Sequence, residues 1–159
     1  MATQVAGTSV RASVVVEAPI EHAFRVFTEQ IGTWWPKEHH LIEGELAEMV
    51  FDPRVGGNIY DREVSGRETR WARVLAYEPP NRLVFSWDLN NQFQIETDTS
   101  KTSEVEVTFV AEGPKRTNVT LQHRNLDRHG EGWEANRDAL ASPEGWQLEL
   151  NAFARAAAA

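Results

Sequence analysis

The stretch VEAPIEHAFRVFTEQIGTWWP, residues 16–36, sets the order of the first structural elements. Just ahead of it, the β-branched run of residues 9–17 places apolar side chains at every second position, which predicts a strand. Pro19 suits the first turn of a helix, and apolar residues then recur with helical spacing. Gly32 is expected to divide this segment and Pro36 to end it. The opening therefore predicts one strand followed by two short helices.

Two adjacent tryptophans close this stretch. Neighbouring residues on a helix point about 100° apart, so Trp34 and Trp35 cannot share one narrow face. Trp34 continues the apolar stripe, and we expect it to pack beneath the helix while Trp35 faces the mouth of a cavity. The alternative is that both rings are wedged into a solid core. A cleft of ~300 Å³ or more beside the aromatic residues would favour the cavity.

The middle of the chain consists of short alternating runs bounded by turn residues, which is typical of an antiparallel β-meander. The turn at residues 79–81 joins two of these runs, and the tight turn at residues 113–115 joins the last two. The expected strands cover residues 47–52, 58–66, 67–78, 82–88, 103–113 and 115–124. Each has one apolar face, which something else must cover.

The C-terminal segment supplies that cover. Residues 130–141 are expected to form a short helix, and residues 142–159 a second one that begins with Ser142 as N-cap. In the second helix, Trp146, Leu150 and Phe153 fall at positions i, i+4 and i+7, so one stripe would face the sheet. The sequence thus predicts an α+β fold in one domain covering residues 1–159.

Composition excludes several classes of function. The 159 residues are 41% apolar, carry a formal charge of -8 and contain no cysteine. The absence of cysteine excludes disulfides and thiolate chemistry, and the negative charge without a basic block argues against nucleic acid as a partner. No apolar run approaches the ~18 residues of a membrane span, and the N-terminus does not resemble a secretion signal. We expect a cytoplasmic protein; whether it forms a homodimer is left open.

Six segments, taken together and in order, resemble the helix-grip fold of the START-like, birch-pollen-allergen-like superfamily, often labelled SRPBCC. They span residues 16–36, 51–62, 74–87, 103–113, 117–126 and 129–140. The double-glycine hairpin at Gly56 and Gly57 is similar to the branch related to the activator of the 90-kDa heat-shock protein ATPase. The resemblance implies a curved sheet of about six to seven strands around a long C-terminal helix. Such a compact single-domain form suits a bacterial protein.

What the resemblance implies about function is broader. Members of the superfamily bind small hydrophobic molecules, act as cyclase or dehydratase-type enzymes on aromatic or polyketide-like substrates, or assist chaperones. We expect the first, with the ligand between sheet and helix and no cofactor; whether the chain is an enzyme stays open. A chaperone role is disfavoured because the chain lacks the separate N-terminal domain of the full-length chaperone activators.

The expected cavity residues are the large side chains assigned to apolar faces, with a few polar ones. They are Trp35, Tyr60, Arg62, Trp71, Phe85, Trp87, Phe109, Leu121, His123, Trp133, Trp146 and Leu150. Alternation places Tyr60 and Arg62 on one face, where they would hold an anion or donate a proton, or else form a solvated rim. His123 alternates in phase with Leu121, so it would either orient a ligand or be satisfied by a buried hydroxyl or carboxylate.

A metal site is not indicated. His39 and His40 are adjacent, with His22 and Glu38 nearby, but consecutive side chains diverge. The chain contains neither an HxxxH nor an HExxH spacing.

Overall fold

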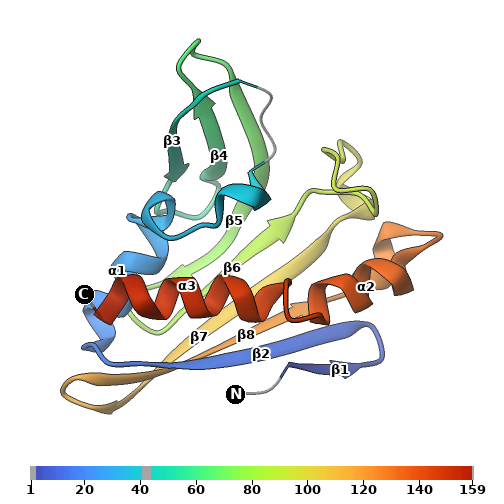
Figure 1. Ribbon diagram of the computed structural model, residues 1–159. Coiled ribbons are helices and arrows are strands. Elements are labelled where there is room, and N and C mark those ends of the chain that lie inside the picture. Colours follow the sequence, from blue (N-terminus) through green and yellow to red (C-terminus); the bar gives the residue numbers. More distant parts are fainter. Residues whose placement is uncertain (1–2, 41–43, 159) are drawn as a thin grey trace.

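One antiparallel sheet curves around the C-terminal helix in the computed structural model, which describes residues 3–40 and 44–158 (Figure 1). Within those residues the sheet has eight strands in the order β1-β2-β8-β7-β6-β5-β4-β3. The strands are β1 (Gln4–Ala6), β2 (Ser9–Val16), β3 (Leu46–Phe51), β4 (Asn58–Glu63), β5 (Glu68–Glu78), β6 (Arg82–Trp87), β7 (Ser103–Gly113) and β8 (Arg116–Arg124). The meander predicted from the sequence is confirmed, and the short strand β1 is an addition to it.

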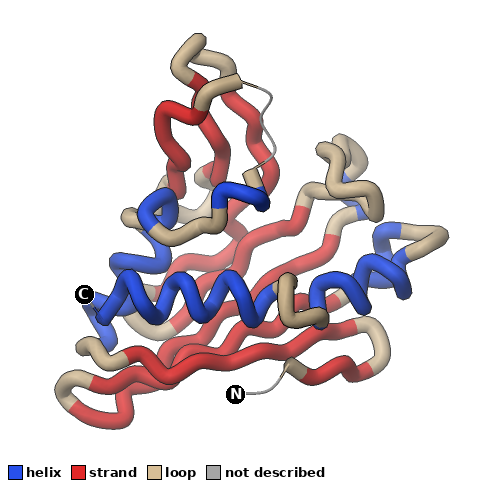
Figure 2. The backbone as a smooth tube through the Cα atoms, viewed as in Figure 1, coloured by secondary structure: helices blue, strands red, loops and turns tan. Residues whose placement is uncertain are grey.

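The helices lie on one side of this sheet (Figure 2). They are α1 (Ile20–Thr28), α2 (Trp133–Ala141) and α3 (Trp146–Ala158), with single 3₁₀ turns η1 (Ile31–Thr33), η2 (Lys37–His39), η3 (Thr99–Lys101) and η4 (Leu126–His129). Helix α3 crosses the sheet, as the helix-grip resemblance implies, and β3, β4 and part of β5 extend beyond it (Figure 1). None of the helices in the described part of the chain has the length and apolar character needed to cross a lipid bilayer.

The second short helix expected after the first strand is instead the pair of turns η1 and η2. A Cβ at Gly32 would lie 3.3 Å from the Met49 side chain of β3, so the glycine allows this strand to approach closely. Pro36 follows four residues later and prevents an α-helix from extending through the segment. The chain therefore turns twice over a short distance, and this brings η2 above the sheet.

The core lies between α1, α3 and the sheet. Phe27 of α1 packs against Trp34 and Phe153, with ring centroids 5.1 and 5.2 Å apart. Phe85, Phe109, Leu121 and Leu150 are buried in the same continuous cluster of apolar side chains. Burial of each such side chain contributes about 1.5–3 kcal/mol, so this cluster fixes α3 on the sheet. The stripe predicted for α3 is confirmed, since Trp146, Leu150 and Phe153 are all buried.

Candidate functional site

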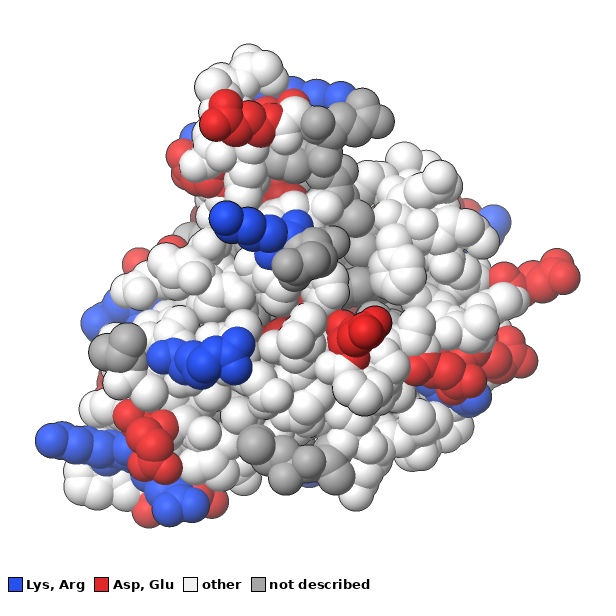
Figure 3. Space-filling view, in the orientation of Figure 1, with Lys and Arg blue, Asp and Glu red and all other residues white. Residues whose placement is uncertain are grey.

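A cavity of about 400 Å³ is lined by the N-terminal half of α3 and by the strands β5 and β6. Its volume falls within the range of small-molecule sites. Its walls come from the sheet, η2, the segment after β6 and the turn between α2 and α3. The lining residues are Trp35, His39, Trp71, Trp87, Leu89, Phe93, Ala139, Leu140, Ser142, Glu144, Gly145, Trp146 and Glu149. Figure 3 shows the face that α3 crosses, where acidic side chains gather over α2 at the right.

Four indole rings form the apolar walls of the cavity. Trp71 of β5 and Trp87 of β6 meet edge to face, with centroids 5.7 Å apart. Trp35 lies 5.1 Å from Trp71, and Trp146 of α3 lies 5.3 Å from Trp87. These rings present flat, rigid apolar surfaces, which favour contact with a flat apolar molecule.

The adjacent tryptophans have partly different surroundings. The Trp34 ring is 5% exposed, packs against Phe153, and donates its indole N–H to the Val26 carbonyl at 2.9 Å. Trp35 lines the cavity, and its ring also contacts the Trp34 ring, with centroids 5.6 Å apart. Both tryptophans thus belong to the buried cluster, and Trp35 also lines the cavity.

The turn between α2 and α3 places Trp146 at the cavity. A Cβ added at Gly145 would overlap the backbone carbonyl of Leu140, so the close approach at this point requires glycine. Helix α3 begins at the next residue. The tight turn therefore determines where the first indole of α3 enters the wall.

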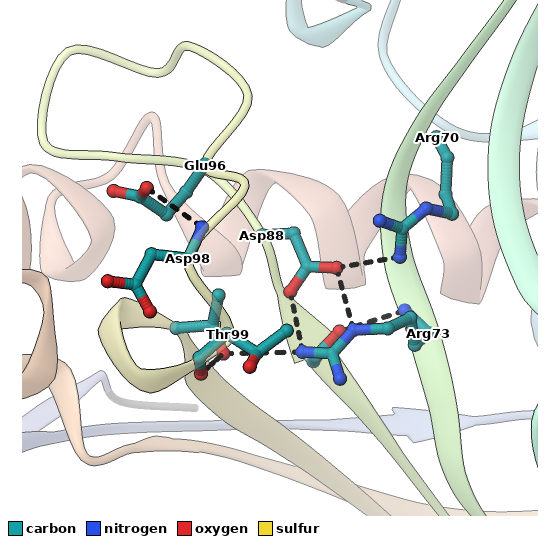
Figure 4. A network of polar contacts seen from close by, with 8 residues as sticks. Arg70, Arg73, Asp88, Glu96, Asp98 and Thr99 are labelled. Carbon is teal, nitrogen blue, oxygen red and sulfur yellow. Dashed lines mark hydrogen bonds and ion pairs between the residues drawn. The ribbon is translucent and has the colours of Figure 1, made fainter.

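A buried ion-pair network holds the strands that carry Trp71 and Trp87 (Figure 4). Asp88 is 2% exposed and accepts two hydrogen bonds from Arg73, from Nε to Oδ2 and from Nη2 to Oδ1, both at 3.0 Å. Arg70 donates to the same carboxylate at 3.2 Å. The hydrogen bond to Asp88 raises the pKa of Arg73 above its usual range. Because these residues neighbour the two tryptophans in sequence, the network fixes the strands behind the cavity wall.

Two titratable side chains line the cavity together. The Nδ1 atom of His39, from η2, contacts the Oε1 atom of Glu149, from α3. Glu149 is 5% exposed, and a carboxylate buried to this degree needs a polar partner, which His39 provides. Next along the chain, His40 Nδ1 lies 3.1 Å from Oδ2 of the buried Asp61 on β4. His39, at the end of η2, and His40, just after it, thus lie beside two different elements, and only the first of these pairs lines the cavity.

Behind the Trp146 wall lies a buried chain of polar groups. The indole Nε1 of Trp146 donates to Nδ1 of His123 at 3.1 Å, so the proton of this imidazole sits on Nε2. That nitrogen lies 2.7 Å from the Ser103 hydroxyl, which lies 2.6 Å from Nε2 of His129. Burial lowers the pKa of His123 well below its usual value and also lowers that of His129.

His123 is therefore held by a buried hydroxyl, which is one of the two alternatives left open by the sequence. Its ring contacts the Trp87 and Trp146 rings at centroid distances of 5.2 and 5.8 Å but is not among the residues that line the cavity. The hydrogen bonds among Trp146, His123, Ser103 and His129 therefore hold the Trp146 ring in the cavity wall.

The structure brings four of the twelve expected cavity residues to the cavity wall, namely Trp35, Trp71, Trp87 and Trp146. Four more lie in the adjoining core, namely Phe85, Phe109, Leu121 and Leu150. Trp133 of α2 does not line the cavity and lies beneath the guanidinium of Arg137, which is 5.1 Å from its ring centroid.

Tyr60 and Arg62 share one face of β4, as alternation predicts, but that face is not part of the cavity. The inward positions of β4 are Ile59, Asp61 and Glu63. Arg62 instead pairs with Glu48 at 3.0 Å and with Glu68 at 3.2 Å. Alternation tells which residues share a face, but with polar residues on both faces of this strand it does not tell which face is buried. Tyr60 and Arg62 are half-buried, and neither lines the cavity.

His39 and Glu149 are two of the four polar cavity residues outside the expected set; Ser142 and Glu144 are the others. Glu149 lies among the apolar residues of α3, between Trp146 and Leu150, and a carboxylate inside an apolar stripe was the available signal. His39 had been considered only as a metal ligand. The two residues are 110 positions apart, and no spacing rule connects them.

A family profile described as "Activator of Hsp90 ATPase homolog 1-like protein" matches residues 17–158. No curated protein sequence matches the chain. The profile thus covers every described element from α1 through α3.

Solved structures give further similarities. An anthrahydroquino-γ-pyrone synthase, Txn09, determined in complex with a compound designated SUM, is 41% identical over 92% of this chain and 95% of its own, with a TM-score of 0.64. The self-sacrificing resistance protein CalC from Micromonospora echinospora is 33% identical over 94% of this chain and 93% of its own, with a TM-score of 0.67. Protein NE0264 from Nitrosomonas europaea, 14% identical over 98% of this chain and 97% of its own, has a TM-score of 0.68 and shows the shared fold alone.

Proposed function

Because the chain belongs to the family of activator of Hsp90 ATPase homolog 1-like proteins, a branch of the helix-grip fold, we propose that it binds a flat aromatic, polyketide-like molecule in the cavity. The observation that carries this proposal is the arrangement of four indole rings around about 400 Å³. A single indole at a surface is unremarkable, but four on one concave site supply apolar contact on several sides of a ligand.

The polar groups at the wall favour a ligand that is not purely hydrocarbon. His39, Ser142, Glu144 and Glu149 line the same cavity. Binding sites of this kind use a few polar groups to orient a mostly apolar molecule. Phenolic hydroxyls and ring carbonyls on a fused aromatic skeleton would match both the indoles and these polar groups.

The two most similar proteins named above support the same class of ligand. One makes a γ-pyrone joined to an anthrahydroquinone, by its name, and this chain is 41% identical to it. The other, at 33% identity, is a resistance protein. Both similarities span more than nine tenths of this chain.

We test the proposal with 1,8-dihydroxyanthraquinone as probe, following quenching of tryptophan fluorescence and the mass of the intact complex. Ala139 lines the cavity from the exposed side of α2, so Ala139→Phe should fill its mouth. Ala135, one turn earlier and also exposed, does not line it, so Ala135→Phe is the matched control.

We expect saturable one-to-one binding by the unmodified protein and by Ala135→Phe, and at least tenfold weaker binding by Ala139→Phe. Equal binding by all three proteins would place the probe elsewhere and would refute the cavity as its site. Absence of binding to the unmodified protein, for this probe and for a fused-ring naphthoquinone and a flavone alike, would refute the ligand class.

The co-chaperone role stays an alternative. It is suggested by the description of the family and not by the geometry of the cavity. It predicts binding to a folded protein partner through an outer surface, whereas the aromatic residues described above face a cavity. Association with a purified 90-kDa chaperone that survives Ala139→Phe unchanged would favour it.

A further inference from the structure

We propose that Phe93 selects ligands by length. Its ring covers the outer end of a flat molecule whose inner end lies among the four indoles, so the cavity favours three fused rings over two. This inference rests on the proposed function, because it assumes that a flat aromatic molecule occupies the cavity. It adds a fifth aromatic surface to the site, from the loop between β6 and β7, and narrows the class of ligand.

The lining of the cavity runs from a buried floor to an exposed mouth. Its four indoles are between 2% and 7% exposed, whereas Phe93 is 41% exposed. Ala139 of α2 and Glu144, in the turn that follows, are the other exposed residues of the lining. A ligand that touches both the indoles and Phe93 therefore extends from the floor of the cavity to its mouth.

The backbone at Phe93 is in a conformation that a phenylalanine rarely adopts. Its φ is 59°, in the left-handed region that glycine and asparagine occupy at the least cost. The other non-glycine residue with a positive φ in the described part of the chain is Asn125. A bulky side chain in this region is strained, and such strain is concentrated at functional sites. A phenyl ring at a position that favours glycine thus indicates a use for the ring that the turn itself does not require.

The tip of the loop is held by the backbone and by one asparagine. The Asn90 side-chain oxygen accepts hydrogen bonds from the backbone N–H groups of Gln92 at 2.9 Å and Gln94 at 3.0 Å. The backbone N–H of Phe93 donates to the Asn90 carbonyl at 2.9 Å. These contacts fix the direction in which Phe93 points without using its ring.

The base of the loop is anchored as well. Leu89 and Ile95 form an antiparallel bridge, and the Asn91 side chain donates to the Glu131 carbonyl at 2.9 Å, just before α2 (Figure 1). The Phe93 ring lies outside the core cluster of the described residues. It is therefore held at the mouth as a fixed apolar surface, which suits contact with a ligand.

A contact at the mouth discriminates between ligands of different length. A molecule of three fused rings gains the contact with Phe93 in addition to its contacts with the indoles. A molecule of two rings that lies against the indoles does not reach Phe93. Selectivity is the difference between the two binding free energies, so the Phe93 ring contributes to it directly.

The test compares 1,8-dihydroxyanthraquinone with 1-naphthol by equilibrium dialysis. The unmodified protein should bind 1-naphthol at least about tenfold more weakly than the anthraquinone, or not measurably. Phe93→Ala should weaken binding of the anthraquinone by about tenfold or more and that of 1-naphthol by less than about threefold. Phe93→Tyr keeps an aromatic ring, so it should bind both probes within about threefold of the unmodified protein.

Ile95→Ala is the matched control. Ile95 belongs to the same loop and is 39% exposed, but it does not line the cavity. Its removal takes a similar apolar side chain from the loop, so binding of the anthraquinone should stay within about threefold of the unmodified protein.

Phe93→Gly separates a role in binding from a role in folding. Glycine relieves the unfavourable backbone conformation, so this variant should unfold at no lower urea concentration than the unmodified protein and at a higher one than Phe93→Ala. It should still bind the anthraquinone about tenfold more weakly or worse, because the ring is absent. A variant that is stable yet binds poorly would support the proposal, whereas a clear loss of stability would show that the ring serves the fold and would overturn it.

The same measurements distinguish the two proposals. If the unmodified protein binds neither the anthraquinone, the naphthoquinone nor the flavone, the proposed function fails, and this inference fails with it. If the anthraquinone binds but Phe93→Ala keeps its affinity, or if Ile95→Ala loses as much, only the inference is overturned. The inference is also overturned if 1-naphthol binds as tightly as the anthraquinone, or if Phe93→Ala weakens both probes by the same factor.

Discussion

Replacing Ser103 with alanine tests the buried polar chain behind the cavity wall. The Ser103 hydroxyl is fully buried and lies 2.7 Å from His123 Nε2 and 2.6 Å from His129 Nε2. Its removal leaves one imidazole donor and one imidazole acceptor buried without this partner. Each orphaned group costs about 1–3 kcal/mol, so we expect the free energy of unfolding to fall by about 2–6 kcal/mol. That is a large fraction of the 5–15 kcal/mol that typically stabilises a domain.

The measurement is urea unfolding followed by tryptophan fluorescence, with two matched serine variants. Ser86 is also buried, and its hydroxyl accepts one hydrogen bond, from the Arg73 backbone N–H at 2.8 Å. Ser86→Ala should therefore cost about 1–3 kcal/mol. Ser65 is exposed and its hydroxyl accepts a long hydrogen bond, 3.4 Å, from the Arg67 backbone N–H, so Ser65→Ala should cost less than about 0.5 kcal/mol.

The expected order of destabilisation is Ser103, then Ser86, then Ser65, with unchanged dependence on urea concentration. A Ser103→Ala protein as stable as Ser65→Ala would refute the reasoning, because the hydroxyl would then contribute nothing. A loss no larger than that of Ser86→Ala would show that only one of the two histidines depends on it.

Three further results are expected. Because burial lowers the pKa values of His123 and His129 while the unfolded chain titrates near about 6.5, the unfolded state takes up protons first as the pH falls. The free energy of unfolding should thus decrease below about pH 6.5, by at most about 1.4 kcal/mol per pH unit for each histidine, and a flat profile between pH 7 and 5 would contradict this. Asp88→Asn removes the carboxylate that Arg73 binds twice, and because the Arg73 side chain is 29% exposed we expect a loss near about 3 kcal/mol, the lower end for buried pairs, in the same urea assay. Gly145→Ala should displace the turn before α3 and weaken binding of 1,8-dihydroxyanthraquinone severalfold, whereas unchanged affinity would show that the turn does not set the wall.

Much of the fold could be predicted because it depends on local periodicity. Alternation in the strands and the i, i+4, i+7 stripe of α3 each describe one element, and each is present. Strand β1 was missed because three residues, Gln4–Ala6, carry too little pattern. The helix expected after Gly32 became two 3₁₀ turns because the segment is short and passes close to β3.

The cavity could be predicted only in part from the sequence. Its lining depends on which faces of the strands and helices come together in the folded protein. Only Trp35 of the adjacent pair lines the cavity, but helical geometry is not the reason, because both residues follow the turn η1 and lie outside any helix. Tyr60 and Arg62 were paired with each other correctly, but local pattern could not tell which side of β4 is covered. The contact of His39 with Glu149 arises from tertiary structure alone, because the residues belong to elements that meet only after α3 lies across the sheet.

The indole rings of the cavity wall and the core also form a continuous chain along which excitation energy can pass. Ring centroids are 5.6 Å apart from Trp34 to Trp35, 5.1 Å from Trp35 to Trp71, 5.7 Å from Trp71 to Trp87 and 5.3 Å from Trp87 to Trp146. At such separations, excitation absorbed by one indole migrates to its neighbours before it is emitted as light. A molecule that quenches the fluorescence of any one of these rings would thus also quench the fluorescence of the other four. Tryptophan emission should therefore report with high sensitivity whether the cavity is occupied.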